Sequence, residues 1–289
     1  MFSSSISRGK QKGWVTFLIY FILIIAATCS LFPIFWTAIT SVKVELEAFL
    51  PTFIPYLQFQ PTIRHWEVEL TQARPEYIKS ISNSFIVAGI STLIALAIGF
   101  CAGYSLARFK LKIGFMKNKD LTTFIFSQII LPPAVIIIPY FLIIRSFGLI
   151  DNQLGLIMAH TMFNLPLAVL LTRDIILGLP KEVEESAMVD GCSRWRTIFR
   201  ITFPLALPAI ISAGLICFAF SWNEFIFALT LTYEKSTTIP LLVSGAKWGR
   251  GIMFWYVAVR SLVALIPPVI LSLFAQRYIV RGLTLGAIK

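Results

Sequence analysis

Six long apolar segments decide what this chain can fold into. They lie approximately over residues 14–40, 84–107, 121–146, 153–177, 204–230 and 253–275. Each is long enough for a helix to cross a bilayer core of about 30 Å, which takes roughly 20 residues. The composition agrees, because 57% of the 289 residues are hydrophobic and 13% are charged, against about 25% charged residues in soluble domains. The sequence therefore predicts an all-α, polytopic membrane protein with six transmembrane helices and one transmembrane domain over residues 1–289.

The backbone within these segments is predicted to be helical, because lipid offers no hydrogen-bond partner to an open backbone. Prolines inside the segments predict bends or interruptions of the helices. Such bends either are tolerated by packing or open the backbone toward a pathway, and the sequence leaves both possible. The prolines are Pro132, Pro133, Pro139, Pro166, Pro267 and Pro268.

The first apolar segment resembles a signal peptide, since Arg8, Lys10 and Lys12 precede it. It continues to about Thr40, well past the usual length of a cleaved segment, and Cys29 lies in a poor cleavage site. We therefore expect a retained first helix.

Basic residues orient the predicted helices. Loop 108–120 holds five cations and one acid, whereas loop 41–83 holds four cations and five acids. Cytoplasmic loops carry the excess of Lys and Arg. Loop 108–120, loop 173–203 and both termini are therefore predicted to be cytoplasmic. The termini contribute Arg8, Lys10, Lys12, Arg277, Arg281 and Lys289.

Catalytic and cofactor motifs are not apparent in the sequence. Gly9-Lys10 is followed by Gln11, so the chain lacks the phosphate loop G-x-x-x-x-G-K-[ST] and is not expected to hydrolyse ATP or to be an enzyme. The net charge of +11 is spread over short loops, which fits membrane topology better than nucleic-acid binding. No metal site, disulfide framework or cofactor is predicted. The relevant residues are Cys29, Cys101, Cys192, Cys217, His65 and His160.

The loop 178–203 has the features of a short, capped helix–turn–helix. Pro180 suits the first turn of a helix, and the acids that follow favour the positive end of the helix dipole. Gly191 can adopt the positive φ that ends a helix, and Ser193 can cap a second short helix over 194–201. The acids are Glu182, Glu184 and Glu185.

The first of these helices has the size of a plug for a groove in a partner protein. About ten residues span roughly 15 Å, and Val183, Ser186 and Ala187 form a face of small side chains. Short helices dock in grooves through such faces. An ordinary helix–turn–helix lying on the membrane is the alternative.

Within this loop the chain resembles a known family. Glu185-Ser186-Ala187 and Asp190-Gly191, with Pro204 and Pro208 further on, resemble the coupling-loop signature of binding-protein-dependent ABC importer permeases. That signature reads Glu-Ala-Ala, then Asp-Gly-Ala, then a hydrophobic stretch and Leu-Pro. The chain departs from it at Ser186, Cys192 and Phe203, which keep these positions small or apolar.

Other runs are similar to the sugar-importer branch of that family, in particular to the second, six-helix subunit of maltose-type permeases. They agree in order and spacing over most of the chain. The runs are Gly103 to Phe109, Leu131-Pro132-Pro133, Gly148-Leu149-Ile150 through Gly155-Leu156-Ile157, Trp222-Asn223-Glu224-Phe225, and Gln276-Arg277-Tyr278 through Gly282-Leu283-Thr284.

The resemblance implies a permease subunit in a bacterial or archaeal cytoplasmic membrane. A second permease would complete the pathway, a cytosolic ATPase dimer would use the ATP, and an extracytoplasmic binding protein would deliver a sugar, oligosaccharide or polyol. The ATPase would contact the coupling loop 178–203. The residues implied there are Glu184, Glu185, Ser186, Ala187, Asp190 and Gly191.

Charged and polar residues within the membrane are the candidates for the pathway, because a charge there is costly. Glu224 and Arg260 are predicted at similar depth in helices five and six. They pair, or Glu224 lines the pathway, or each side chain reaches the membrane interface independently. Asn164, Ser221 and Asn223 can offer hydrogen bonds to sugar hydroxyls, or they join helices together.

Three other functions remain open from the residues alone. A permease for a non-sugar solute would keep the coupling loop. A secondary transporter or channel usually shows ionisable relays or an inverted repeat, and neither is evident. A membrane-embedded enzyme needs a catalytic constellation, and none is found.

Overall fold

The computed structural model describes residues 13–245, 247–248 and 251–285. A helical content of 77% against 3% strand confirms the predicted all-α class. The chain divides into two compact units, Met1–Thr71 with Ala246–Leu262, and Gln72–Gly245 with Val263–Lys289. The single permease domain over 1–289 stays a prediction. The cations Arg8, Lys10, Lys12 and Lys289, which the topology prediction used, lie outside the described residues.

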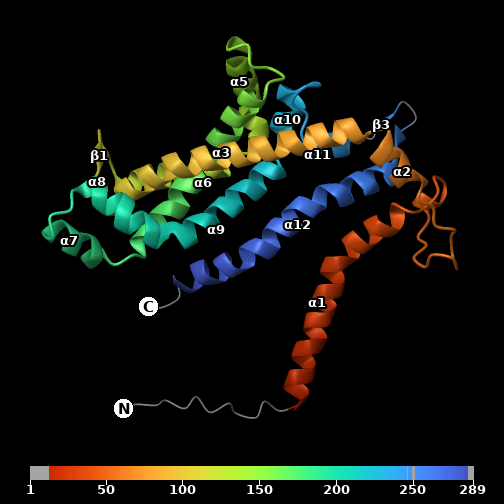
Figure 1. Cartoon of the computed structure of the whole chain (residues 1–289), viewed down its shortest axis with the longest axis horizontal. Coiled ribbons are helices and arrows are strands. Elements are labelled where there is room, and N and C mark those ends of the chain that lie inside the picture. Colours follow the sequence, from red (N-terminus) through yellow and green to blue (C-terminus); the bar gives the residue numbers. More distant parts are fainter. Residues whose placement is uncertain (1–12, 246, 249–250, 286–289) are drawn as a thin grey trace. The chain divides into compact units, whose positions relative to one another are not determined.

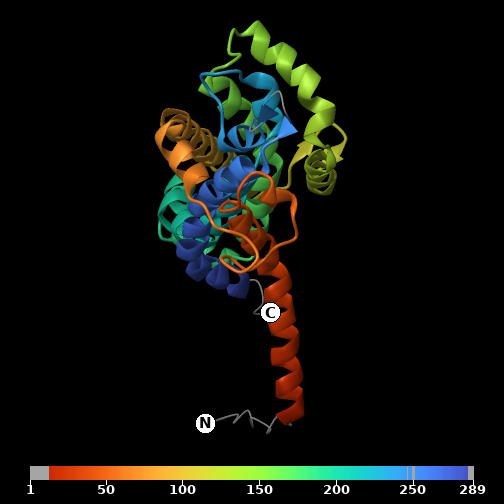
Figure 2. The same cartoon turned by 90° about the vertical axis from the view of Figure 1, so that its right-hand side faces the viewer.

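The first unit begins with α1, which Figure 2 shows as one long helix. Most of its apolar side chains are exposed. Such a helix needs lipid or another subunit around it, because exposed apolar area is unfavourable in water. The elements of this unit are α1 (Gly13–Thr40), the 3-10 helix η1 (Glu47–Phe49), α2 (Arg64–Thr71), the hairpin β3 (Lys247–Trp248) and β4 (Gly251–Ile252), and the start of α12 (Phe254–Leu285).

Two buried cations tie the segments after α1 together. Lys43 is fully buried and donates from Nζ to the carbonyl oxygen of Leu50 at 2.9 Å. The same ammonium lies 4.5 Å from the ring centroid of Trp36, at cation–π distance. Glu69 on α2 accepts two hydrogen bonds from Arg260 on α12, from Nε at 3.1 Å and from Nη2 at 3.0 Å.

The second unit carries the remaining helices (Figure 1). They are α3 (Arg74–Arg108), α4 (Asn118–Ile130), α5 (Pro133–Ser146), α6 (Gln153–Leu177), α7 (Lys181–Val189), α8 (Arg194–Thr197), the π-helical segment η2 (Ile198–Thr202), α9 (Phe203–Trp222), α10 (Ile226–Leu231), α11 (Ile239–Ser244) and the rest of α12. A small hairpin, β1 (Lys112–Ile113) with β2 (Met116–Lys117), lies between α3 and α4.

Small residues let α3 and α6 pack backbone to backbone. A Cβ atom on Gly103 would lie 2.7 Å from the backbone nitrogen of Arg173, and one on Gly99 would lie 2.8 Å from the Cβ of Ala168. Thr172 Oγ1 also donates to the carbonyl oxygen of Gly99 at 2.7 Å. Close approach at small residues and hydrogen bonds between helices are what hold helices together in lipid.

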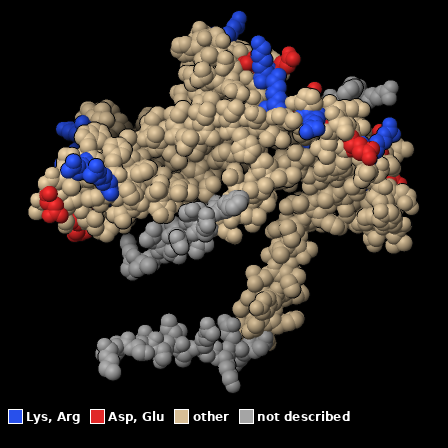
Figure 3. All heavy atoms as spheres, in the orientation of Figure 1, with Lys and Arg blue, Asp and Glu red and all other residues tan. Residues whose placement is uncertain are grey.

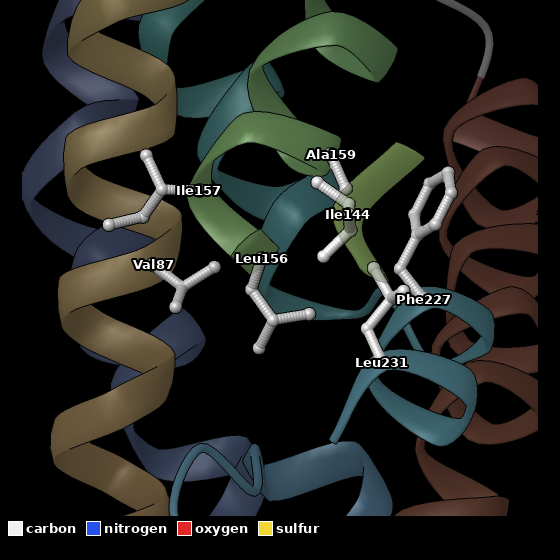
Figure 4. Packing of buried hydrophobic residues seen from close by; sticks show 7 residues of the cluster. All are labelled: Val87, Ile144, Leu156, Ile157, Ala159, Phe227 and Leu231. Atoms are coloured by element: carbon white, nitrogen blue, oxygen red, sulfur yellow. The ribbon is translucent and has the colours of Figure 1, made fainter. Parts of the chain in front are cut away.

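An apolar core joins α3, α5, α6 and α10 (Figure 4). Phe227 and Leu156 are fully buried in it, which is typical of a well-packed interior. This core holds the short helix α10 against the long ones. Its members are Val87, Ile144, Leu156, Ile157, Ala159, Phe227 and Leu231.

Two predicted crossings are interrupted. The segment 121–146 is α4 and α5, which meet at a bend of 93°. The described residues therefore hold five helices long and apolar enough to cross a membrane, or six if this bent pair is one span. Pro132 and Pro133 prevent the hydrogen bonds that would carry one helix through. The segment 204–230 is α9 and α10 with a break at residues 223–225. The segments 14–40 and 153–177 are confirmed as α1 and α6.

The distribution of charge in the second unit suits a membrane span. On the face shown in Figure 3, the middle of this unit shows no charged side chains. Lys and Arg show at the end that carries β1, α7 and α8, together with acids, and other charged side chains show at the opposite end. The cation-rich segment 108–120 and the loop 178–203 therefore share one end of the unit, as their common cytoplasmic prediction requires.

Candidate functional site

The loop 178–203 folds as the sequence predicts in its first half. Helix α7 begins after Pro180 and ends at a Schellman motif, in which Cys192 N–H bonds the Ala187 carbonyl at 3.0 Å and Gly191 N–H bonds that of Met188 at 3.1 Å. Gly191 has a φ of +85°, a conformation that a side chain would strain. The helix is therefore compact and capped.

The second half differs from the prediction. Ser193 caps α8 by accepting from Arg196 N–H at 3.4 Å, as expected. The chain then continues through η2 into α9 without a stop, so the short helix over 194–201 is the first part of a longer one. Pro204 lacks the N–H that would bond the carbonyl of Arg200, and a π-type widening accommodates such a missing bond.

The structure divides the six predicted coupling residues between two faces of α7 and its cap. Glu185, Ser186, Asp190 and Gly191 are exposed, whereas Glu184 and Ala187 are buried against the rest of the unit. Val189 adds an apolar side chain that is 87% exposed. The outer face therefore combines acids, small residues and an apolar group, and it excludes Glu184.

Glu184 has its partners on α3. Its Oε1 lies 2.8 Å from Arg108 Nη2 and accepts from Arg108 Nε at 2.9 Å, while its Oε2 accepts from the Tyr104 hydroxyl at 2.9 Å. Arg108 also donates to the carbonyl oxygen of Leu179 at 3.1 Å. Tyr104, Arg108 and Glu184 are termed the α3–α7 clasp. Charge-assisted hydrogen bonds in a buried setting are the strong ones.

A second polar cluster lies inside the unit, where α3, α6 and α9 meet. Ser221 Oγ lies 2.6 Å from His160 Nδ1 and 3.0 Å from Ser91 Oγ. His160 Nε2 lies 3.6 Å from the carboxylate of Glu224. Asn164 Nδ2 donates to the carbonyl oxygen of Cys217 at 3.1 Å. All five side chains are buried and join helices to one another.

Glu224 caps helix α10. Its carboxylate accepts from the N–H groups of Ile226 at 2.7 Å and Phe227 at 3.0 Å. The predicted pair of Glu224 with Arg260 stays a prediction, and the contacts that the structure shows are others: Glu224 contacts α10 and His160, and Arg260 contacts Glu69. The prediction assumed one continuous helix over 204–230, and the break after Trp222 turns Glu224 back onto the following helix.

Asn223 is the predicted pathway residue that reaches an open space. It is exposed at the C-terminal end of α9 and lines a cavity of about 450 Å³ between α9 and α12. The other three, Asn164, Ser221 and Glu224, are buried in the cluster just described. The cavity is lined by Leu215, Ile216, Phe218, Ala219, Phe220, Trp222, Asn223, Pro268, Leu271 and Ser272.

The sequence did not predict the contacts of three residues, Tyr104 and Arg108 in the α3–α7 clasp and His160 in the second polar cluster. Tyr104 and Arg108 belong to the motif Gly103 to Phe109, but their partner lies 76 residues or more away. His160 seemed isolated because Ser221 is 61 residues distant. Within the described part of the chain, no group of three or more His, Cys, Asp or Glu residues is placed to hold a metal ion.

Long apolar helices, a face whose middle shows no charged side chains and a capped helical loop at one end are together typical of a membrane-spanning subunit. The chain belongs to the family of binding-protein-dependent transport system inner membrane components, whose model matches residues 96–285. It is a permease subunit of an ABC importer.

Relatives and solved structures agree with this family. The chain is 30% identical to the trehalose/maltose transport system permease protein MalG of Thermococcus litoralis, over 92% of this chain and 94% of that one. It is 32% identical to the diacetylchitobiose uptake system permease protein DasC of Streptomyces coelicolor, over 89% and 91%. Its fold matches a bacterial ABC transporter that imports alginate, with a TM-score of 0.69 and 20% identity over 93% of this chain and 98% of that chain.

Proposed function

We propose that this ABC importer permease imports a sugar, an oligosaccharide or a polyol. The observation that carries the proposal is the similarity, over nine tenths of the chain, to permeases named for trehalose, maltose and diacetylchitobiose. The cavity between α9 and α12 supports it, because Asn223 and Ser272 can bond hydroxyl groups while the surrounding rings and aliphatic chains contact the apolar face of a sugar.

The subunit forms half of a pathway and works with three kinds of partner: a second permease, an ATPase dimer in the cytosol and a binding protein outside. The outer face of α7, with Glu185, Ser186, Asp190 and Gly191, is the ATPase contact. ATP is bound by that partner, and this chain needs no cofactor of its own. The cation-rich loop 108–120, the coupling loop and both termini lie in the cytoplasm.

Reconstitution tests the proposed function. The tagged full chain, purified from the membrane of the cell that makes it, is expected to carry a second permease and an ATPase with it. Vesicles containing this complex and its binding protein should accumulate labelled maltose, trehalose, raffinose or diacetylchitobiose only when ATP is supplied. Uptake without nucleotide, driven by an ion gradient, would instead establish a secondary transporter. ATP-driven uptake of labelled amino acids in place of the sugars would contradict the substrate class.

The docking face is tested by reversing one exposed charge. Glu185→Lys places a cation on the outer face of α7 and is expected to remove most of the ATPase from the purified complex. The matched control is Lys112→Glu on β1, an exposed charge at the same end of the unit. Equal retention of the ATPase by both variants would show that α7 is not the contact.

A further inference from the structure

The α3–α7 clasp fastens the coupling helix to one particular transmembrane helix. Glu184 is 7% exposed, and both of its carboxylate oxygens are engaged by side chains of α3. Because the Glu184 carboxylate and the Arg108 guanidinium are both buried and charged, their contact resists separation far more than a surface ion pair does. Glu184 therefore faces α3 while its neighbour Glu185 faces outward.

The N-terminal part of α3 is hydrogen-bonded to the loop that precedes α11. Asn83 Nδ2 donates to the carbonyl oxygens of Lys235 at 3.1 Å and Thr237 at 2.9 Å. Ser84 Oγ accepts from the N–H of Ile239 at 2.9 Å. These buried contacts hold segment 235–239, between α10 and α11, to the N-terminal third of α3.

Helix α3 can move as one rigid body that connects the clasp to the loop at its other end. It runs unbroken for 35 residues, or about 50 Å. Its one proline, Pro75, lies in the first turn, where it does not bend the helix. Contact with α6 through Gly99 and Gly103 stiffens its C-terminal third.

We propose that Glu184 is a positioning residue that transmits motion of α7 to α3, and through Asn83 and Ser84 to segment 235–239. This rests on the proposed function in one respect, namely that an ATPase moves α7. The coupling helix and the loop at the far end of the unit are then linked by one rigid helix. Without the clasp, α7 still binds the ATPase through its outer face but slides relative to α3.

The test measures transport for each ATP hydrolysed in the reconstituted complex. Glu184→Gln removes the charge and keeps the size of the side chain. Transport per ATP is expected to fall by about fivefold or more, the low end of coupling between distant sites, while the amount of ATPase in the complex stays the same. Glu182→Gln, on the exposed face of the same helix, is the matched control and should leave the ratio unchanged.

A second variant distinguishes a loss of coupling from a loss of folding. Glu184→Met combined with Arg108→Met removes both buried charges, and such replacements usually preserve folding. It should have the wild-type unfolding temperature and ATPase content but the same loss of coupling. A wild-type ratio in both variants overturns the proposal, as does loss of the ATPase from the complex, which would make Glu184 a docking residue. An equal fall in Glu182→Gln overturns it too.

A readout at the far end of α3 separates transmission from stability. With Lys235→Cys as the sole cysteine, ATP with vanadate should change the rate of maleimide labelling in the wild-type background and leave it unchanged in Glu184→Gln. An equal change in both backgrounds contradicts the proposal. If the wild-type complex lacks an ATPase or ATP-driven uptake, the proposed function fails instead.

Discussion

At the scale of single residues, several buried charges are matched by specific partners within the chain. Glu184 pairs with Arg108, and Glu69 pairs with Arg260. Asp151, which is only half-buried, accepts from the N–H groups of residues 233–236. Leaving a buried charge without its partner costs about 3–5 kcal/mol. Such residues therefore fix the positions of loops and helices.

Asp151 gives a pH dependence that can be measured. Burial alone would raise the pKa of Asp151, but the four N–H donors hold this pKa below its ordinary value of 3.8. The carboxylate therefore stabilises the fold fully above pH 3.8 and loses this contribution as the pH falls through the folded-state pKa. Asp151→Asn should lower stability by about 1 kcal/mol at pH 7, a low value because the carboxylate is partly solvated.

The measurement is the thermal unfolding of the purified chain in lipid nanodiscs over a pH series. The gap between wild type and Asp151→Asn should close at acid pH. Glu234→Gln, an exposed side chain in the same loop, should show little gap at any pH. A gap for Asp151→Asn that persists unchanged well below pH 3.8 would contradict the argument.

At the scale of elements, the closeness of α3 and α6 controls how the second unit is built. Gly99 and Gly103 lie where a side chain has no room, whereas Gly89 on the same helix has no atom within 4 Å of its would-be Cβ. Glycines of one helix thus carry two different constraints. The difference comes from the neighbouring helix, and helix propensity affects both alike.

Alanine substitutions separate these two effects. Gly103→Ala should destabilise the chain by about 1–3 kcal/mol, because the new methyl group meets the backbone of Arg173. Gly89→Ala should be neutral or stabilising by up to about 1 kcal/mol, since alanine is the better helix former. Thermal unfolding in nanodiscs compares the two. Similar shifts for both variants would mean that the contact between α3 and α6 is looser than the structure shows.

At the scale of the whole molecule, the proposed function requires the second unit to transmit motion between its two ends. The second unit offers a capped helix at the cation-rich end and a clamped loop at the opposite end of α3. No phosphate loop lies in its sequence. In the proposed function, energy for transport reaches the chain through contact with an ATPase partner, and the exposed face of α7 is the proposed surface for that contact.

The orientation of the chain in the membrane can be tested at the two ends of the second unit. In a background with all four cysteines replaced by alanine, Lys235→Cys should react with a membrane-impermeant maleimide in intact cells. Lys112→Cys should react only after the cells are permeabilised, because loop 108–120 is predicted to face the cytoplasm. The reverse result would invert the topology and remove the coupling loop from reach of a cytosolic ATPase.

The sequence by itself determined the class of fold, the extent of α1 and α6, and the capped helix that ends at Gly191. These follow from local physics, since apolar length forces helices in lipid and a glycine allows a positive φ. The family resemblance also came from contiguous residues, at Glu185 to Gly191.

Only the tertiary structure decided what the polar residues contact. Glu184 faces inward to Arg108, whereas its neighbour Glu185 is exposed. Glu224 contacts α10 and His160, and Arg260 contacts Glu69. Asn223 lines a cavity. Helical periodicity separates the faces of a helix but does not say which neighbour each face meets. Those partners lie tens to hundreds of residues apart, and the close packing of the long helices brings them together.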